Sequence, residues 1–304
     1  MTTIVVVGVP TALGGDAAGQ ERTPAALRSR GLLDRLHRDP AMARATIQDA
    51  GDLRIEPGFA PDRDRHAKNR AAIAEFLPRE ARLVADALGG AGPEARLLVL
   101  GGDCTAHAGA TAGLRRTQPG HRVGLAWFDA HGDFNTPETT PSGNVWGMPF
   151  AMICGRGDRA LVSAADGPTV RLQDAALLGG QVLDQQESRD LAASPIAHFG
   201  AGMLATDAGL DSFGAWAAAV ARDVDAFHVA FDLDALDAAG DWAVQMPEPN
   251  GLSFATAVAA IQRIRAAGAV RSFGITGVNL DHGDAARTVD AIVALASAAL
   301  GDRP

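Results

Sequence analysis

Six short segments of almost continuously apolar residues recur along this chain, and stretches with helical periodicity separate them. Strands that expose one face to water alternate apolar and polar residues, whereas strands covered on both faces are apolar throughout. The sequence therefore predicts a doubly wound α/β fold with a mainly parallel central sheet flanked by helices. We expect strands at 4–9, 96–100, 123–128, 175–178, 228–231 and 272–275, and helices at 24–36, 71–88, 105–116, 253–267 and 285–300.

Composition and charge limit the class of protein. The chain has 304 residues, 47% of them apolar, and no linker rich in Pro, Ser or charge divides it, so we expect residues 1–304 to form a single domain. A net charge of −9 with scattered arginines argues against nucleic acid or a membrane surface as a partner. No transmembrane run or signal peptide is evident. Two cysteines are too few for a disulfide framework, so we expect a cytoplasmic protein.

Two acidic clusters directly follow expected strands. They are Trp127-Phe-Asp-Ala-His-Gly-Asp133 and Phe231-Asp-Leu-Asp-Ala-Leu-Asp237. Alternate side chains of an extended segment point the same way, so Asp129, His131 and Asp133 are expected to converge on one centre. The same holds for Asp232 and Asp234. Ligands in such sheets bind beyond the carboxyl ends of the strands, so both clusters and the Gly-Gly-Asp-Cys segment at 101–104 are expected on one rim.

The chemistry of these clusters indicates a metal site. Four carboxylates and an imidazole at one edge of a sheet repel each other unless cations neutralise them. Oxygen-rich ligation with one imidazole suits Mn²⁺, Mg²⁺ or Fe²⁺. Two such ions sharing carboxylates would lower the pKa of a bridging water from about 16 toward neutrality. The alternative is that these Asp residues are helix N-caps or turn formers. The segment 133–165 is too long for an ordinary connection and is expected to be a functional loop.

Three segments carry a resemblance to a known family, namely GGDCT at 101–105, WFDAHGDFNTPETTPSGNVWGMP at 127–149 and FDLDALD at 231–237. Together they resemble the ureohydrolases of the arginase and agmatinase group, and weaker similarity extends over nearly the whole chain. The resemblance implies a three-layer arginase/deacetylase-like fold and a single ureohydrolase-like catalytic domain. It also implies a manganese pair and a homo-oligomer, either a trimer or a hexamer.

The same resemblance implies a role for each residue of the acidic clusters. One ion would be held by Cys104, Asp129, Asp133 and Asp232. The other ion would be held by His131 and Asp234, with Asp129 and Asp232 bridging the two. Asp133 would also accept a proton from the bridging hydroxide during attack on a guanidinium carbon.

Residues that match the arginase pattern for the amino-acid end of a substrate follow the first cluster. By resemblance, the α-carboxylate would be held by Asn135, Thr140, Ser142 and Asn144. Asp184 and Glu187 match a pair that faces the α-ammonium. Two alternatives stay open. In the first alternative, the segment 139–144 is only a solvated polar loop. In the second, Asp184 and Glu187 belong to a surface helix; this alternative stays open because the family's arginine just before the pair is Gln181 here.

Four departures from the family pattern lie at the other end of the substrate. Cys104 replaces a metal-binding His, Trp146 a proton-shuttling His, Gly277 a carboxylate near the guanidinium, and Met246 a Thr. Loss of the carboxylate removes a charge-assisted hydrogen bond of roughly 1.5 to 3 kcal/mol, which favours a less basic or bulkier substrate. Our leading hypothesis is therefore hydrolysis of Nω-hydroxy-L-arginine to L-ornithine and hydroxyurea, an activity of antibiotic biosynthesis. Gly277 would leave room for the extra oxygen.

Alternatives remain at each departure. Cys104 is either a thiolate that holds Mn²⁺ weakly or a buried, unreactive thiol. Trp146 stands at the position of the family's proton-shuttling His, and it either stacks on the guanidine or is a rim aromatic. In both cases solvent or Asp133 would have to protonate the leaving amine. His107 and His228 are expected to be structural. The whole chain could instead be an arginase, a ureohydrolase for another guanidino acid, or a metal-poor, non-catalytic homologue with a binding or regulatory role.

Overall fold

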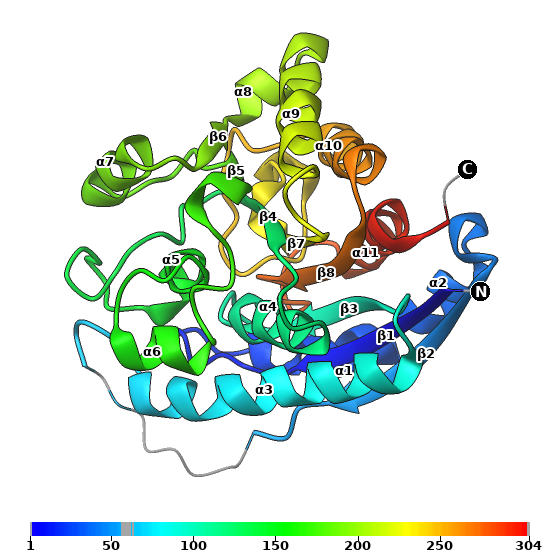
Figure 1. Cartoon of the computed structure of the whole chain (residues 1–304), viewed down its shortest axis with the longest axis horizontal. Coiled ribbons are helices and arrows are strands. Elements are labelled where there is room, and N and C mark those ends of the chain that lie inside the picture. Colours follow the sequence, from blue (N-terminus) through cyan, green and yellow to red (C-terminus); the bar gives the residue numbers. More distant parts are fainter. Residues whose placement is uncertain (1, 56–61, 63, 303–304) are drawn as a thin grey trace.

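A single sheet forms the centre of the molecule. The structure is a computed structural model that describes residues 2–55, 62 and 64–302, and within them eight parallel strands pair in the order β2-β1-β3-β8-β7-β4-β5-β6 (Figure 1). The strands are β1 (Thr2–Val9), β2 (Ala45–Asp52), β3 (Arg96–Gly101), β4 (Val123–Asp129), β5 (Ala175–Gly179), β6 (Ala197–Phe199), β7 (Ala226–Asp232) and β8 (Val270–Thr276). All six expected strands are present, so the prediction of a mainly parallel sheet is confirmed.

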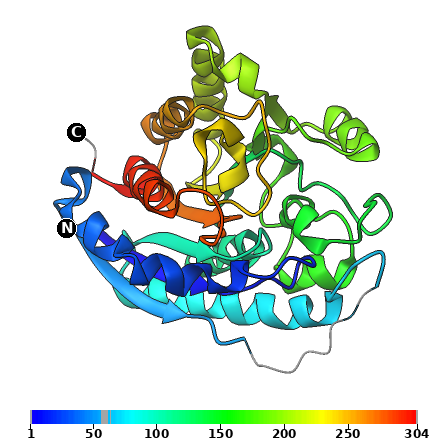
Figure 2. The same ribbon diagram turned by 180° about the vertical axis from the view of Figure 1, so that it is seen from behind.

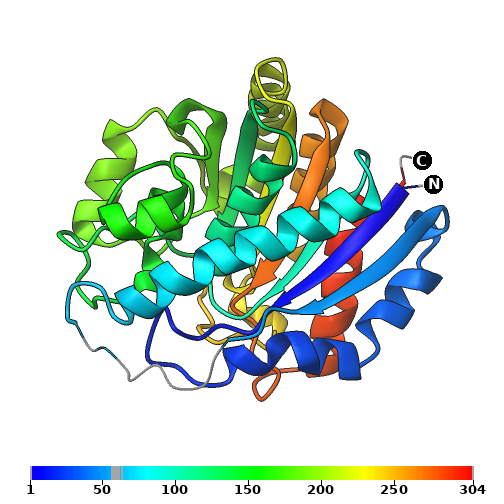
Figure 3. The same cartoon turned by 60° about the horizontal axis from the view of Figure 1, so that its bottom comes forward.

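Helices cover both faces of this sheet and complete three layers. Alternate residues of β1 enter different cores: Val5 and Val7 pack with α3 to α6, whereas Ile4 and Val6 pack with α1, α2 and α9 to α11. Figure 3 shows α3 lying across one face, and Figure 2 shows α1 and α11 on the other. The helices are α1 (Thr23–Ser29), α2 (Leu32–Arg38), α3 (Arg70–Ala91), α4 (Ala106–Thr117), α5 (Pro149–Ile153), α6 (Arg159–Ala164), α7 (Gln185–Ala193), α8 (Ala201–Leu204), α9 (Asp207–Val220), α10 (Phe254–Ala267) and α11 (Ala285–Leu300).

Several expected elements need correction. The helix expected at 24–36 is two helices, because Gly31 adopts a left-handed φ of +78° between them. The edge strands β2 and β6 were not expected, since β2 is only partly buried and β6 spans three residues. The segment 133–165 is not irregular throughout, because it contains α5 and α6. In the described part of the chain, no helix combines the length and apolar character needed to cross a membrane.

Candidate metal centre

Four central strands end on one rim and bring distant residues together. The register pairs Phe128 of β4 with Phe231 of β7, so the following residues, Asp129 and Asp232, lie side by side. Asp232 in turn pairs with Thr276, the last residue of β8. The next strand is β3, and the turn after it carries Cys104. The expectation that the acidic clusters share a rim with the Gly-Gly-Asp-Cys segment is therefore met.

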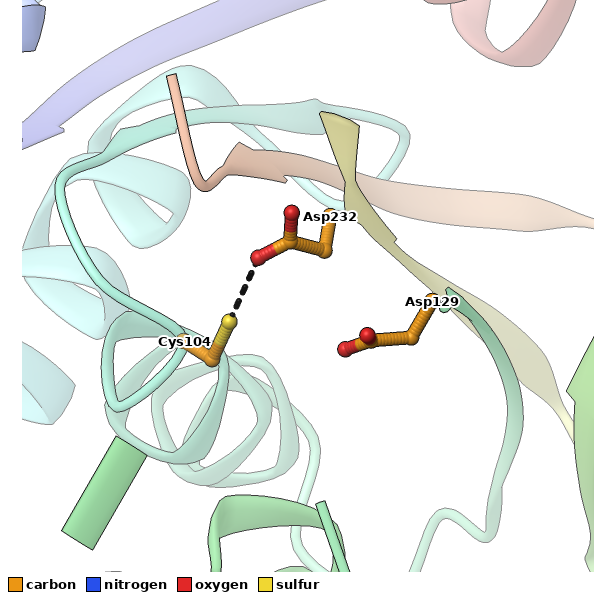
Figure 4. A group of neighbouring side chains, drawn as sticks. All are labelled: Cys104, Asp129 and Asp232. Carbon is orange, nitrogen blue, oxygen red and sulfur yellow. Dashed lines mark hydrogen bonds between the residues drawn. The ribbon is translucent and has the colours of Figure 1, made fainter. Parts of the chain in front are cut away.

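Two groups of potential metal ligands form at this rim. Ligand atoms of Cys104, Asp129 and Asp232 lie within 4.8 Å of one another, and so do those of Asp129, His131 and Asp234. Figure 4 shows the side chains of the first group pointing toward a common point. Because Asp129 belongs to both groups, the arrangement suits two cations bridged by a carboxylate.

The His131 imidazole is held between two carboxylates. Its Nδ1 lies 3.3 Å from Asp129 Oδ1 and 3.1 Å from Asp234 Oδ2. Burial lowers the pKa of His131, but the hydrogen bonds to these two carboxylates and their negative charges together outweigh burial and raise the pKa overall. The backbone N–H of His131 also donates to Asp129 Oδ1 at 2.7 Å, which fixes the carboxylate at the end of β4.

The charge of the acidic residues is not balanced by protein cations alone. Burial first, and then the neighbouring charge of Asp129, raises the pKa of Asp232 to about 6. Burial and nearby carboxylates also raise the pKa values of Asp133 and Asp234 well above their usual range. Asp133 Oδ2 is buried and has no hydrogen-bond partner in the part of the chain that the structure describes. Because buried charges are costly unless they are paired, these residues fit a site for divalent cations.

The backbone that leads from β4 to Asp133 differs from the expected extended segment. The strand ends at Asp129, and Asp133 has a left-handed φ of +47°, so the segment between them is not continuously extended. The expected extended backbone at 129–133 is therefore wrong, although Asp129 and His131 do converge on one group of potential ligands. Asp133 lines the pocket but lies outside both groups of potential ligands.

The thiol of Cys104 makes polar contacts. It is 7% exposed, and its Sγ donates to Asp232 Oδ2 at 2.8 Å and lies 3.5 Å from Thr276 Oγ1. Burial, followed by the charges of the nearby aspartates, raises the pKa of the thiol well above its usual range. The Cys104 thiol is thus both buried and hydrogen-bonded, and its raised pKa keeps it protonated unless a cation displaces the proton.

A pocket of about 330 Å³ opens onto this centre. Every residue expected at the site lines it: Cys104, Asp129, His131, Asp133, Asn135, Thr140, Ser142, Asn144, Trp146, Asp184, Glu187, Asp232, Asp234, Met246 and Gly277. The lining therefore combines acidic and metal-ligating groups with neutral hydrogen-bonding groups.

The polar loop of the pocket is fixed by hydrogen bonds. The Thr140 hydroxyl accepts from the backbone N–H groups of Ser142 and Gly143 at 3.3 and 3.0 Å. Lys68 Nζ donates to Asn144 Oδ1 at 2.8 Å. The sequence analysis missed Lys68, and its position far from the motif left no local signal.

Asp184 and Glu187 join α7 to the pocket. They form a capping box at the start of α7. Glu187 is 2% exposed, and its Oε1 accepts from the backbone N–H of Phe134 at 2.9 Å, which excludes a surface role for this residue. Burial raises the pKa of Glu187 to about 7. Asp184 Oδ2 accepts from Asn135 Nδ2 at 2.9 Å, so the two expected halves of the substrate site touch each other.

Two of the family departures are explained by packing. Gly277 has a φ of +71°, and a Cβ added there would lie 2.0 Å from Asp232 Oδ1. The Asp232 carboxylate therefore fills the space that a side chain would enter, and the idea that Gly277 leaves it for a substrate atom is wrong. The indole of Trp146 packs against Gly15, because a Cβ added to Gly15 would lie 2.2 Å from the indole ring. Trp146 also lines the pocket.

Glu248 is an acidic pocket residue that the sequence analysis missed. Its Oε1 lies 3.7 Å from His131 Nε2, on the side of the imidazole away from the aspartates. Met246, two residues earlier, is 40% exposed and lines the same pocket. The only available signal was the proximity of Glu248 to Met246 in the sequence.

Comparisons with known proteins cover nearly the whole chain. A model described as the Arginase family matches residues 2–301. The arginase of Bacillus caldovelox is 30% identical over 313 residues, which cover 100% of this chain and 99% of that protein. The native structure of Bacillus caldovelox arginase aligns with a TM-score of 0.88 at 29% identity, covering 100% of this chain and 99% of that one. The crystal structure of arginase from Bacillus cereus aligns with a TM-score of 0.86 at 28% identity and covers 99% of each chain.

Proposed function

This chain belongs to the arginase family of metal-dependent amidinohydrolases, and we propose that it hydrolyses a guanidino C–N bond of an arginine-like amino acid. The observation that carries the proposal is the pair of ligand groups that share Asp129 and line a pocket with neutral polar residues. The acidic groups suit a metal-activated water, and the neutral donors suit a carboxylate.

The described residues fit two divalent cations, for which we propose Mn²⁺. Cys104, Asp129 and Asp232 would hold one, and Asp129, His131 and Asp234 the other. When bound, such a pair supplies a water whose pKa is lowered toward neutrality. Asp133 is then the proton acceptor, because its buried Oδ2 has no hydrogen-bond partner among the described residues.

The neutral polar residues of the pocket bind the amino-acid end of the substrate. Amide and hydroxyl groups of Asn135, Thr140, Ser142 and Asn144 donate to an α-carboxylate. The carboxylate of Asp184 faces the α-ammonium, and Glu187 holds the backbone at Phe134 in place through its hydrogen bond. The indole N–H of Trp146 does not ionise near neutral pH and cannot shuttle a proton, so solvent or Asp133 protonates the leaving amine.

L-Arginine is the first candidate substrate, because proteins similar to this chain over most of its length are named arginases. Nω-Hydroxy-L-arginine is the second candidate, and the pocket favours it at two positions. Gly277 supplies no carboxylate for a strongly basic guanidinium, and Trp146 supplies no general acid. The hydroxylated guanidine is less basic and depends less on both groups.

A product assay separates these candidates. Purified protein loaded with Mn²⁺ would be given L-arginine, Nω-hydroxy-L-arginine or agmatine, with ornithine, urea and hydroxyurea measured. Turnover of either amino acid supports the proposal, and the ratio of kcat/KM values identifies the preferred one. Faster turnover of agmatine, which lacks the α-carboxylate, would contradict the assigned role of the neutral polar residues. No bound metal and no turnover would favour the non-catalytic alternative.

We further propose a trimeric or hexameric assembly, by resemblance to the family. Light scattering of the purified protein measures its mass in solution. A monomer would contradict this assignment without affecting the proposed chemistry.

A further inference from the structure

A chain of hydrogen-bonded side chains runs through the core to the metal centre. Ser272 Oγ lies 2.8 Å from His228 Nδ1, and His228 Nε2 lies 3.2 Å from His107 Nδ1. His107 Nε2 lies 3.1 Å from Thr276 Oγ1, which lies 3.4 Å from Asp232 Oδ2. No member is more than 5% exposed. The two histidines that the sequence analysis treated as structural therefore connect to a potential metal ligand.

The carboxylate of Asp232, at one end of this series of hydrogen bonds, fixes which group donates in each of them. Asp232 Oδ2 accepts from the Thr276 hydroxyl, so this hydroxyl is left to accept from His107 Nε2. A neutral imidazole has one donor and one acceptor nitrogen, so His107 Nδ1 accepts from His228 Nε2. His228 Nδ1 then accepts from Ser272. Burial keeps both rings neutral, because it lowers the pKa of His107 well below its ordinary value and that of His228 to about 3.

The surrounding residues make room for the two rings and orient them. Gly274 of β8 is required beside His107, because an added Cβ would lie 2.7 Å from the ring carbon Cε1. Trp127 packs edge-on against His107 with ring centroids 5.1 Å apart. The Trp127 Nε1–H donates to Asp129 Oδ2 at 3.0 Å, so the same cluster of rings also supports the shared ligand.

Thr276 connects this series of hydrogen bonds to the metal centre. Its hydroxyl lies 3.4 Å from Asp232 Oδ2 and 3.5 Å from Cys104 Sγ. Both atoms belong to one group of potential ligands. With its lone pair engaged by His107, the hydroxyl proton of Thr276 points toward that group.

We propose that Thr276, His107 and His228 are positioning residues, which hold Asp232 and Cys104 in the orientation that binds one cation. The proposal rests on the proposed function only in requiring a divalent cation at this centre. Outer hydrogen bonds of this kind are typically worth about 10- to 100-fold in metal affinity. We therefore expect Thr276→Val to weaken cation binding by that factor, and Thr276→Ser, which keeps the hydroxyl, to restore most of it.

The test is a titration of the metal-free full chain with Co²⁺. Calorimetry measures the binding affinity, and absorption spectroscopy measures the thiolate-to-cobalt charge-transfer band that Cys104 would give. Thr276→Val should weaken binding and shift or reduce this band. Thr288→Val is the matched control, because Thr288 is equally buried, accepts from Ala243 N and lies outside the chain of hydrogen bonds. Its affinity and spectrum should equal those of the wild type.

Variants of His107 provide a second arm in case Thr276→Val folds poorly. His107→Leu removes the donor to Thr276 and should lower the affinity, whereas His107→Gln keeps a donor near the Nε2 position and should lose less. Wild-type affinity and spectrum in both Thr276→Val and His107→Leu would overturn the inference, as would a wild type that binds no divalent cation. A wild type that binds Co²⁺ but hydrolyses no guanidino amino acid would overturn only the proposed function.

Discussion

Replacement of Gly277 by Ala tests how closely the backbone beside the centre controls a metal ligand. The left-handed φ of +71° costs a residue with a Cβ about 1–2 kcal/mol. The added Cβ would also lie 2.0 Å from Asp232 Oδ1, whereas real contacts are at least 3.0 Å, so the carboxylate must move by about 1 Å. Displacement of that size is expected to lower kcat/KM on the order of 100-fold.

Gly31→Ala is the matched control for this experiment. Gly31 has a similar φ of +78°, but no heavy atom of the described residues lies within 4 Å of its added Cβ. Urea denaturation should show a loss of about 1–2 kcal/mol in both variants, while Mn²⁺ affinity and kcat/KM should fall only in Gly277→Ala. Equal metal affinity and equal activity in the two variants would refute the reasoning.

Three further substitutions test separate parts of the site. Cys104→His replaces a soft thiol with an imidazole and should raise the Mn²⁺ content at that position; unchanged content under equal Mn²⁺ would contradict this. Glu248→Gln, which removes a negative charge 3.7 Å from His131, should raise KM for cationic substrates more than it lowers kcat, and an unchanged KM would oppose a binding role. Burial lowers the pKa of His228 to about 3, below the ordinary value near 6.5, so the unfolded chain binds this proton first as the pH falls. His228 therefore removes stability as the pH falls from about 6.5 to 3, so the Tm of His228→Gln should rise relative to that of the wild type over this range; parallel curves would argue against a neutral buried imidazole.

The sequence predicted the central strands because strands buried on both faces need apolar residues at every position. It located Asp129 and Asp232 because the carboxyl ends of parallel strands lie on one rim. The edge strand β2 was missed because it is only partly buried. The break at Gly31 was missed because glycine is compatible with either continuing or ending a helix.

The parts of the site that the sequence could not predict depend on long-range contacts. Gly277 meets Asp232 through the register of β7 and β8, and no local pattern contains that distance. The hydrogen bond between His107 and His228 depends on how α4 packs against the sheet. Asp133 has a left-handed φ, which the expected alternation of an extended segment did not include.

The most direct test of the metal centre is the amount of Mn²⁺ bound per chain by the wild type and by Asp129→Asn, measured by elemental analysis after equal reconstitution. Asp129 is the residue common to both ligand groups, so its loss should lower occupancy of both positions while the wild type approaches two ions per chain. A wild type without bound metal, or an Asp129→Asn variant that binds as much as the wild type, would contradict the account.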